Sequence, residues 1–333
     1  PFDTAVSRLS LAETDADLDA ADLIFDTGEL LPDPPVKLKD GGAWLMTSPD
    51  VAVEDRAAEV NAEGRMLRLR KLMRNSQILE LSAPPSLQPG MVETVYAALA
   101  QDHQHVVFTK DTPGGLVGSL FAALARTALV MLASGQRPSL VEEAARSLGF
   151  RQGPLQMIDV LGAGRSLALM RRVYEHRGAS LAPLRLLSDR MADVTGGDAS
   201  RARRALVFHA PAGQSFARDP DLQEWLTEWR SDHDHAPAAW PETDLKDALL
   251  AALVREAVNL HANGIVERLS DIDLATVHGL MMDRRRGGPL IAADVAGLLG
   301  IKRGLERLTT VDPALWSKSD QLDDMIKYGR RFF

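Results

Sequence analysis

The hydrophobic positions of this chain change their spacing along the sequence, and each spacing predicts a type of element. Short apolar runs predict five strands, at residues 21–26, 43–47, 66–69, 78–81 and 105–109, and a helix is predicted at 91–101. Strands that alternate with helices imply an α/β layer in residues 1–109. Further along, the segment 116–134 is apolar on nearly every side, which predicts a helix that is buried all round.

The helical part of the chain repeats itself. Residues of the same type recur 129 to 135 positions later, in these pairs: Leu124 and Leu253, Arg126 and Arg255, Gly135 and Gly264, Ser139 and Ser270, Gly153 and Gly288, Asp159 and Asp294, Gly162 and Gly297. A match of this length is far more specific than a short motif. It predicts two helical domains, at 110–200 and 243–333, joined by a linker at 201–242. Each has more apolar helix surface than it can cover alone, so we expect the two to pack together as a pseudo-dimer.

The repeated pattern resembles the C-terminal domain of 3-hydroxyacyl-CoA dehydrogenases. The resemblance lies in the Asp-Thr-Pro-Gly turn at 111–114, the helix ending in Gly135, the second helix that begins near Ser139, and the Gly-Pro-Leu, Asp and Gly positions that follow. Tandem copies of this domain look like those that close the multifunctional fatty-acid oxidation proteins. The resemblance implies a mainly α fold, in which a reduced Rossmann-like domain at 1–109 precedes two helical domains of the kind that the family uses for dimerisation.

A dinucleotide site requires a strand, a Gly-rich turn and a helix N-terminus that bind the pyrophosphate. Nothing before Gly28 supplies such a turn, and Gly41-Gly42 is a bare loop with acidic residues before it. The run from Leu155 to Gly164 imitates the motif, but Leu167 takes the place of its third glycine. We therefore expect no cofactor in this chain. NAD is the expected cofactor only under the alternative that the chain is an active dehydrogenase.

The resemblance also assigns the catalytic positions. The family has a Ser-containing run, a His on the next strand, a Glu twelve residues after that His, and an Asn in the Pro-Gly helix. In this sequence the corresponding residues are Ser48, Arg68, Glu80 and Gly118. A guanidinium, whose pKa lies above about 12, cannot take the proton of a 3-hydroxyl group. Ser48 and Glu80 are thus predicted catalytic remnants. The alternatives are a turn or cap residue for Ser48, and for Glu80 a carboxylate that neutralises nearby arginines.

A basic segment occupies the place of the catalytic strand. Residues 64–74 contain five bases and no acid, and the alternation of arginine with leucine predicts a half-exposed strand with one basic face. Arg68, Arg70 and Lys71 are candidates for binding the phosphates of CoA or an acidic partner. The alternative is that they neutralise the acidic segment 1–59.

The linker and the second copy contain further candidates. A short helix at 222–230 is expected to dock its tryptophans on a neighbouring element. The Asp-His-Asp-His run at 232–235 has ligand-type residues, but without a second cluster it favours a solvated linker, so no metal site is predicted. The three arginines at 284–286 suit either a phosphate contact or a solvated turn.

Composition limits the classes of function. The chain has 333 residues, 45% hydrophobic and 25% charged, which is typical of a globular protein, and its formal net charge of −8 opposes nucleic-acid binding. Cysteine is absent, Arg126 interrupts the longest apolar helix, and no export signal is evident at the acidic N-terminus, so we expect a cytoplasmic protein without a membrane span.

The predicted function is therefore that of an assembly or acyl-CoA-binding subunit of fatty-acid oxidation, without NAD binding or catalysis. Its expected partners are acyl-CoA or another subunit, in a homo- or hetero-oligomer formed through the helical domains. The alternative is an active NAD-dependent enzyme that oxidises 3-hydroxyacyl-CoA to 3-ketoacyl-CoA.

Overall fold

The computed structural model describes residues 21–27, 38–49, 51–100, 105–202, 205–212, 215–236, 240–313, 315–316 and 319–333. They form two compact units. The first consists of the described residues up to Arg70 together with Leu79–Asp111, and the second of Lys71–Ile78 and Thr112–Phe333. The boundary predicted at 109 lies two residues before the end of the first unit. The assignment of Lys71–Ile78 to the second unit was not foreseen.

The first unit is built on a five-stranded sheet in the order β1-β2-β3-β4-β5. Its strands are β1 (Leu23–Asp26), β2 (Ala43–Met46), β3 (Met66–Arg70), β4 (Ile78–Ala83) and β5 (His105–Lys110). β2 pairs in parallel with β1 and with β3, whereas β3 and β4 are antiparallel. All five predicted strands are present.

Two helices cover this sheet, α2 (Val53–Glu59) and α3 (Met91–Leu99). Trp44 and Met46 pack in one apolar cluster with Val53 of α2, while Leu45 packs in another with Val95 of α3. Successive strand residues point to opposite faces of a sheet, so the two helices cover opposite faces. The expected α/β layer is confirmed, and its strands carry the candidate catalytic residues.

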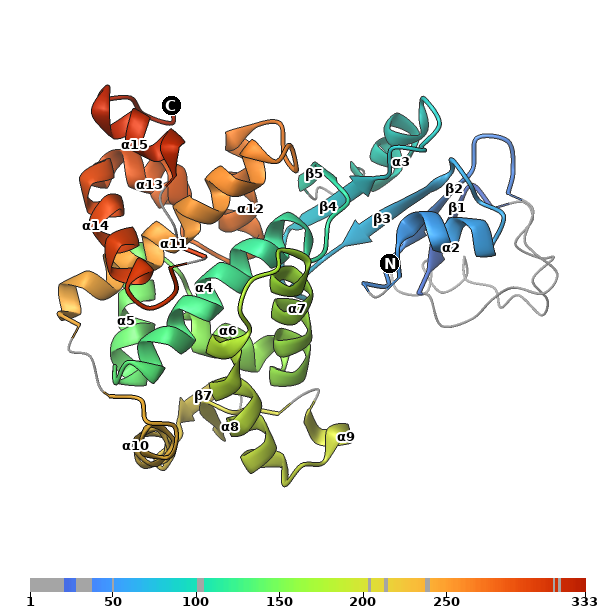
Figure 1. The fold of residues 1–333 in the computed structure, drawn as a ribbon. Coiled ribbons are helices and arrows are strands. Elements are labelled where there is room, and N and C mark those ends of the chain that lie inside the picture. Colours follow the sequence, from blue (N-terminus) through green and yellow to red (C-terminus); the bar gives the residue numbers. More distant parts are fainter. Residues whose placement is uncertain are drawn as a thin grey trace. The chain divides into compact units, whose positions relative to one another are not determined.

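The second unit is helical (Figure 1). Its first run of helices is α4 (Gly115–Ala133), α5 (Pro138–Leu148), α6 (Pro154–Leu161), α7 (Ala163–His176) and α8 (Arg185–Thr195), with a short 3-10 helix η3 (Ala182–Leu184) before α8. The second run is α11 (Glu242–Ala262), α12 (Leu269–Gly279), α13 (Pro289–Ala296), α14 (Leu298–Thr309) and α15 (Asp320–Lys327), with a 3-10 helix η4 (Arg284–Arg286) before α13. The long helices that begin the two runs, α4 and α11, pack against each other.

Local chain geometry is the same in both runs. Gly153 and Gly288 each precede a helix that begins with Pro, a residue that suits the first helical position. Gly162 and Gly297 stand between consecutive helices with φ values of 93° and 87°, a region that favours glycine. These repeated glycines therefore serve to turn the chain between helices.

Equivalent loops of the two runs also meet. Phe150, which follows α5, forms an antiparallel bridge with Met282, which follows α12. The bridge is flanked by hydrogen bonds from Arg151 N to Met281 O, 3.2 Å, and from Asp283 N to Gly149 O, 2.8 Å. The same loop of each copy thus contacts its counterpart.

The segment predicted as a linker contains regular structure. It includes the end of α9 (Ala199–Ala202), a hairpin of β6 (His209–Ala212) and β7 (Ser215–Arg218), and α10 (Leu222–Asp232). The predicted helix at 222–230 is confirmed. Trp229 in it donates from Nε1 to Asp189 Oδ2 of α8 at 2.9 Å, in agreement with the expected docking of its aromatic residues. The hairpin was not predicted.

One described helix, α4, is long and apolar enough to cross a membrane by length and composition. The core helix of a globular protein meets the same criterion, and 94% of the apolar window of α4 is buried inside the protein. Its burial confirms the sequence prediction for the segment 116–134.

Candidate functional site

The predicted site residues of the first unit meet on one face of the sheet. In the β3–β4 register, Arg70 stands opposite Glu80 and Arg68 opposite Ser82. Residues directly opposite each other on antiparallel strands share a face, so these four side chains are neighbours. Together with Thr109 and Asp111 at the end of β5 they form what we call the arginine–carboxylate cluster.

Arg68 is held inside this cluster. It is 3% exposed, and its Nε donates to Asp111 Oδ1 at 3.0 Å. Nη2 donates to the backbone oxygen of Val51 at 2.6 Å, and Nη1 donates to that of Ser48. The expectation of a half-exposed basic face was wrong at Arg68, because Asp111 and the backbone carbonyls of Ser48 and Val51 surround its guanidinium. A buried charge requires such partners.

Arg70 and Glu80 add one further positive and one further negative charge to the arginine–carboxylate cluster. Arg70 donates from Nη2 to Asp111 Oδ1 at 2.7 Å and from Nη1 to Ser82 Oγ at 2.6 Å, and Nη1 lies 3.6 Å from Glu80 Oε1. Glu80 is buried and accepts a 3.0 Å hydrogen bond from Thr109 Oγ1. The cluster contains two guanidinium groups and two carboxylates. This geometry favours the interpretation of Glu80 as a carboxylate that neutralises arginines, while its catalytic role stays a prediction.

The remaining predicted site residues are placed differently. Ser48 is half-buried and contributes its backbone carbonyl to Arg68, while Lys71 is exposed and belongs to the second unit. Gly118, at the position of the family's Asn, lies buried in α4, where an added Cβ would come within 3.2 Å of Leu169 Cδ1. No side-chain amide is available at that position. Since none of the six cluster residues is a histidine, the cluster lacks the usual base for a hydroxyl proton.

The strand–helix turns of the first unit test the fit of a dinucleotide. A helix N-terminus binds phosphate because its free N–H groups and its dipole attract negative charge. The first turn of α2, which follows β2, carries Glu54 and Asp55, and that of α3 carries Glu93. These carboxylates repel a pyrophosphate, so the starts of α2 and α3 are poor sites for one. The Gly162 turn does not fit either, because residues 155–160, which imitate a strand in the sequence, lie in helix α6.

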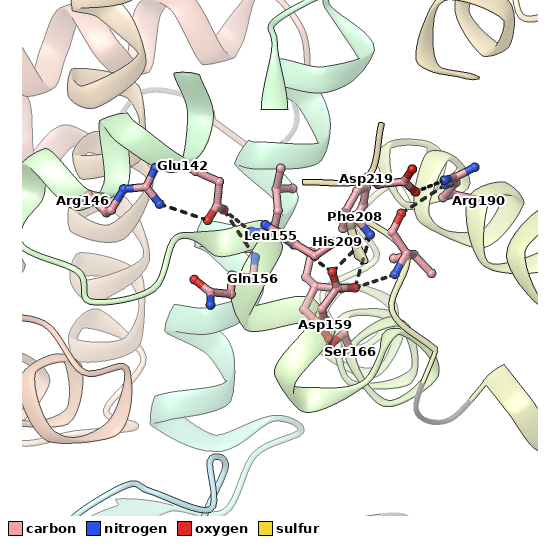
Figure 2. A network of polar contacts seen from close by, with 12 residues as sticks. Glu142, Arg146, Leu155, Gln156, Asp159, Ser166, Arg190, Phe208, His209 and Asp219 are labelled. Carbon is pink, nitrogen blue, oxygen red and sulfur yellow. Dashed lines mark hydrogen bonds and ion pairs between the residues drawn. The ribbon is translucent and has the colours of Figure 1, made fainter. Parts of the chain in front are cut away.

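A second polar network lies in the first helical run (Figure 2). Asp159 accepts hydrogen bonds from Val207 N at 2.7 Å, from His209 Nδ1 at 2.9 Å and from Phe208 N at 3.2 Å. Glu142 accepts from Leu155 N at 2.8 Å, at the start of α6. Burial raises the pKa of the Glu142 carboxyl, although its backbone hydrogen bonds oppose this shift.

The second helical run repeats this arrangement. Asp273 accepts from Leu290 N at 2.8 Å, at the start of α13, and Asp294 accepts from Phe332 N at 3.0 Å. Burial raises the pKa of Asp273 to about 6. One acid of each run therefore holds a helix N-terminus, and the other holds a chain segment that returns to the helices. Sequence analysis matched Asp159 with Asp294 but gave neither a role, although their recurrence was the signal.

Two candidates remain from the sequence, the histidine-containing run at 232–235 as metal ligands and the arginines at 284–286 as phosphate ligands. His233 lies with Nδ1 2.7 Å from the backbone oxygen of Trp229 and with Nε2 3.4 Å from Asp189. No group of three or more His, Cys, Asp or Glu side chains suited to a metal ion occurs among the described residues. Arg284–Arg286 form the exposed helix η4, and a phosphate contact there stays a prediction.

Comparison with known proteins finds similarity in the helical part of the chain. The family model for the 3-hydroxyacyl-CoA dehydrogenase C-terminal domain matches residues 115–228. The peroxisomal bifunctional enzyme of Cavia porcellus is 23% identical over 251 residues, which cover 71% of this chain and 34% of the relative. The peroxisomal fatty acid beta-oxidation multifunctional protein MFP2 of Arabidopsis thaliana is 25% identical over 196 residues, 57% of this chain and 26% of the relative. The chain thus spans about a quarter to a third of the length of these relatives.

Solved structures share the fold. The 3-hydroxybutyryl-CoA dehydrogenase from Escherichia coli K12 superposes with a TM-score of 0.71 at 16% identity, covering 98% of this chain and 85% of that one. The dehydrogenase part of multifunctional enzyme 1 from C. elegans gives 0.58 at 12% identity, covering 97% of this chain and 76% of that one. The resemblance predicted from the repeat is confirmed, and at these identities the structural likeness concerns the fold alone.

Proposed function

We propose that this chain, whose residues 115–228 match the model of the 3-hydroxyacyl-CoA dehydrogenase C-terminal domain, acts in fatty-acid oxidation as an assembly or acyl-CoA-binding subunit. In this proposal the chain itself neither binds NAD nor transfers hydride. It works through its two helical modules, residues 110–200 and 243–333.

One observation carries the proposal: Arg68 occupies the position at which the resemblance places the catalytic base. Its Nε is 3.0 Å from Asp111 Oδ1, and its other nitrogens donate to backbone carbonyls. A permanently protonated group cannot take the substrate's hydroxyl proton, and a general base typically contributes about 10²–10⁴-fold to the rate. Glu80 accepts from Thr109 in the same cluster, which gives it a structural role.

We further propose that the two modules form a pseudo-dimer within the chain. The matching order of helices, the packing of α4 against α11 and the bridge between Phe150 and Met282 support this arrangement. In a twofold arrangement the same patch of each partner contacts its counterpart, as these two equivalent loops do.

The second module also supports a role in assembly. Val295 is 84% exposed and Leu299 is 66% exposed, on either side of Gly297. Apolar side chains exposed together are typical of surfaces that bind other proteins. For acyl-CoA binding, Lys71 is the exposed member of the three basic candidates, whereas Arg68 is buried and Arg70 is half-buried. The cytoplasm stays the proposed compartment, which imaging of a tagged chain in its host would test.

A steady-state assay tests the catalytic part of the proposal. With 3-hydroxybutyryl-CoA and NAD, the parent chain should show no turnover above background, and Arg68→Ala should not change this result. NADH fluorescence should likewise show no saturation at micromolar cofactor.

The alternative is an active dehydrogenase, and Glu80→Gln distinguishes the two. Robust turnover by the parent that Glu80→Gln abolishes would overturn the proposal and assign catalysis to Glu80. Lys39→Gln is a suitable control, because Lys39 pairs with Asp22 at an exposed site outside the cluster.

A further inference from the structure

Three apolar side chains of the second module are exposed to water, on α13 and at the start of α14. Val295 is 84% exposed, Leu299 is 66% exposed and Ile291 is 39% exposed. Ile291 and Val295 lie four residues apart, so they share one face of α13. Apolar side chains that are exposed together are typical of a surface that a partner covers.

The first module does not carry this apolar character. At the offset of 135 residues, Gln156 corresponds to Ile291 and Gly164 corresponds to Leu299. Helices α6 and α7, which contain Gln156 and Gly164, form without apolar side chains at these positions. The exposed Ile291 and Leu299 are therefore not a requirement of this type of helix pair.

Exposed arginines flank these side chains at the start of α13. Arg284–Arg286 form η4, directly before α13, and all three are exposed. Gly287 ends η4, and a Cβ placed on it would come within 2.8 Å of Ile291 Cδ1. The side chain of Ile291 thus lies against the turn that ends the arginine run.

The segment after α15 brings further basic residues to the other end of α13. Asp294, which precedes Val295, accepts a hydrogen bond from Phe332 N at 3.0 Å. Arg330 and Arg331, the two residues before Phe332, are exposed. The hydrogen bond to Asp294 therefore holds both arginines near the exposed side chain of Val295.

An exposed aromatic ring lies beside two cations of the same segment. Tyr328 is 58% exposed, and its ring centroid is 5.0 Å from Lys327 Nζ and 5.3 Å from the guanidinium carbon of Arg330. Phe333 is 59% exposed. Tyrosine has an apolar body and a polar tip, and it is enriched at the boundary between membrane and water.

The charge of these two segments is opposite to that of the whole chain. Residues 283–299 and 327–333, which we call the basic apolar face, contain six basic residues and two acidic ones. The formal net charge of the chain is −8. A basic apolar face suits a partner that is both anionic and apolar. A second copy that met this face with its own would place arginines against arginines, which disfavours such a dimer.

We propose that the basic apolar face binds an anionic lipid surface, with Val295 and Leu299 inserted below the headgroups and the arginines in contact with them. A side chain that protrudes as Val295 does enters this boundary without a groove of complementary shape. Each basic residue beside an anionic bilayer strengthens binding about fivefold. The inference rests on the assembly role proposed above, to which it adds the surface on which assembly takes place.

Co-sedimentation of the whole chain with lipid vesicles tests the proposal. Binding is expected to vesicles of phosphatidylcholine and phosphatidylglycerol at about 0.1 M salt, and it should weaken at about 1 M salt, where exposed charges are screened. Vesicles of pure phosphatidylcholine should bind much less, because they lack anionic headgroups. The test uses neither NAD nor a hydroxyacyl substrate, so its failure is distinct from a failure of the catalytic part of the proposed function.

Substitution of the protruding side chains tests the apolar contribution. Val295→Ser combined with Leu299→Ser should weaken binding to the anionic vesicles about tenfold or more, because less apolar surface leaves water. Both side chains are exposed, so the variant should keep the thermal transition of the parent. The matched control is Val194→Ser on α8, where the side chain is 43% exposed and the affinity should not change.

Substitution of the basic residues tests the electrostatic contribution. Arg330→Gln and Arg331→Gln should each weaken binding to the anionic vesicles about fivefold. Arg171→Gln is the matched control, because Arg171 is an exposed arginine of α7 in the first module and should leave the affinity unchanged.

The absence of cysteine from the chain permits a direct measurement of insertion. Val295→Cys labelled with the fluorophore NBD should become brighter on anionic vesicles, because NBD emission rises when the label leaves water. Val194→Cys with the same label should not change. This measurement replaces a single exposed side chain, so it remains informative even where the double serine variant fails to fold.

Several results would overturn the proposal. These are no sedimentation of the parent with anionic vesicles, equal affinity of the double serine variant, or an unchanged signal from the label at position 295. Release of the chain from vesicles by poly-L-glutamate at equal charge concentration would assign the basic apolar face to an acidic protein. Self-association of the parent that the serine substitutions abolish would assign it to a second copy of the chain.

Discussion

The two helical modules share their helices but not the chemistry of their mutual contact. In both, a glycine with positive φ turns the chain, an acid holds the start of the third helix, and an aspartate holds a returning segment. At the contact, however, Arg126 donates to Asp312, whereas Arg255 lies close to both Glu256 and Arg177. Residues that set the path of the chain are alike in the two copies, whereas residues between the copies have diverged.

This difference has an energetic reason. A glycine at φ near 90° or an acid beneath a helix N-terminus satisfies a requirement inside each module, so each copy needs its own. A charged residue at the contact between the modules needs a partner only at its own place in that contact. Its equivalent in the other module can therefore have a different partner. The contact between the modules is therefore asymmetric. On one side Arg126 pairs with Asp312, and on the other Arg177 pairs with Glu256 beside a cavity of about 250 Å³.

The largest expected effect breaks the closed side. Asp312→Ala leaves the fully buried guanidinium of Arg126 without its carboxylate, and removing one partner of a buried pair costs about 3–5 kcal/mol. Glu256→Ala on the open side should cost less, about 1–3 kcal/mol, because Arg177 is 22% exposed and can reach water. Urea unfolding measures both. Equal losses would mean that the two halves are energetically alike.

Next in size is the core that the modules share. Leu124 and Leu253 are both 0% exposed, at equivalent positions of α4 and α11. Leu→Ala at either position should cost about 2–5 kcal/mol, because it removes buried methyl groups and leaves a cavity. The exposed Arg285→Ala should stay within about 0.5 kcal/mol of the parent. If either leucine variant had the same free energy of unfolding as Arg285→Ala, the idea of a core built equally from both modules would be contradicted.

A smaller effect is expected where the two returning segments are held. Asp159 is buried and accepts from two backbone N–H groups and His209, whereas Asp294 is half-buried and accepts from the last two residues of the chain. Asp159→Asn should therefore cost about 1.5–3 kcal/mol and Asp294→Asn less than half of that. Thermal unfolding of the two variants shows which substitution costs more stability. A larger loss of stability for Asp294→Asn would contradict the expectation.

The elements that sequence reasoning placed well depend on local pattern. Apolar runs between turn residues gave the five strands, and helical spacing gave α4, because burial of an element is encoded in its own residues. The recurrence of glycine and aspartate predicted a helical repeat, which stays a prediction, and the recurring glycines Gly162 and Gly297 do stand between consecutive helices. Each of these signals lies within a short stretch of the sequence, or in such a stretch and the later stretch that resembles it.

The misplaced features depend on contacts between distant segments. The exposure of Arg68 is decided by Asp111, 43 residues later, and by the backbone at Ser48. The hairpin of β6 and β7 lies in a stretch interrupted by Pro211 and Pro220, which predicted a linker. The cavity beside Arg255 results from residues of both modules, and no spacing in the sequence brings them together.

The smallest expected effect is a dependence on pH at the acids beneath the third helices. Burial raises the pKa of Asp273 from 3.8 to about 6, with repulsion from Asp294 adding to the shift and the hydrogen bonds from Leu290 and Ile291 opposing it. Between these two pH values the folded protein binds a proton that the unfolded chain has released. Stability contributed by this proton is present below about pH 4 and is lost as the pH rises to about 6.

Asp273→Asn removes the titration and isolates this effect. The free energy of unfolding of the parent minus that of the variant should fall from pH 4 to pH 6 and then level off, in urea titrations at each pH. Glu142→Gln is the matched variant of the first module, and because burial raises the pKa of Glu142 as well, its difference should change in the same direction. A difference that grows with pH for Asp273→Asn would show that the carboxylate is stabilised by the helix N-terminus more than it is penalised by burial.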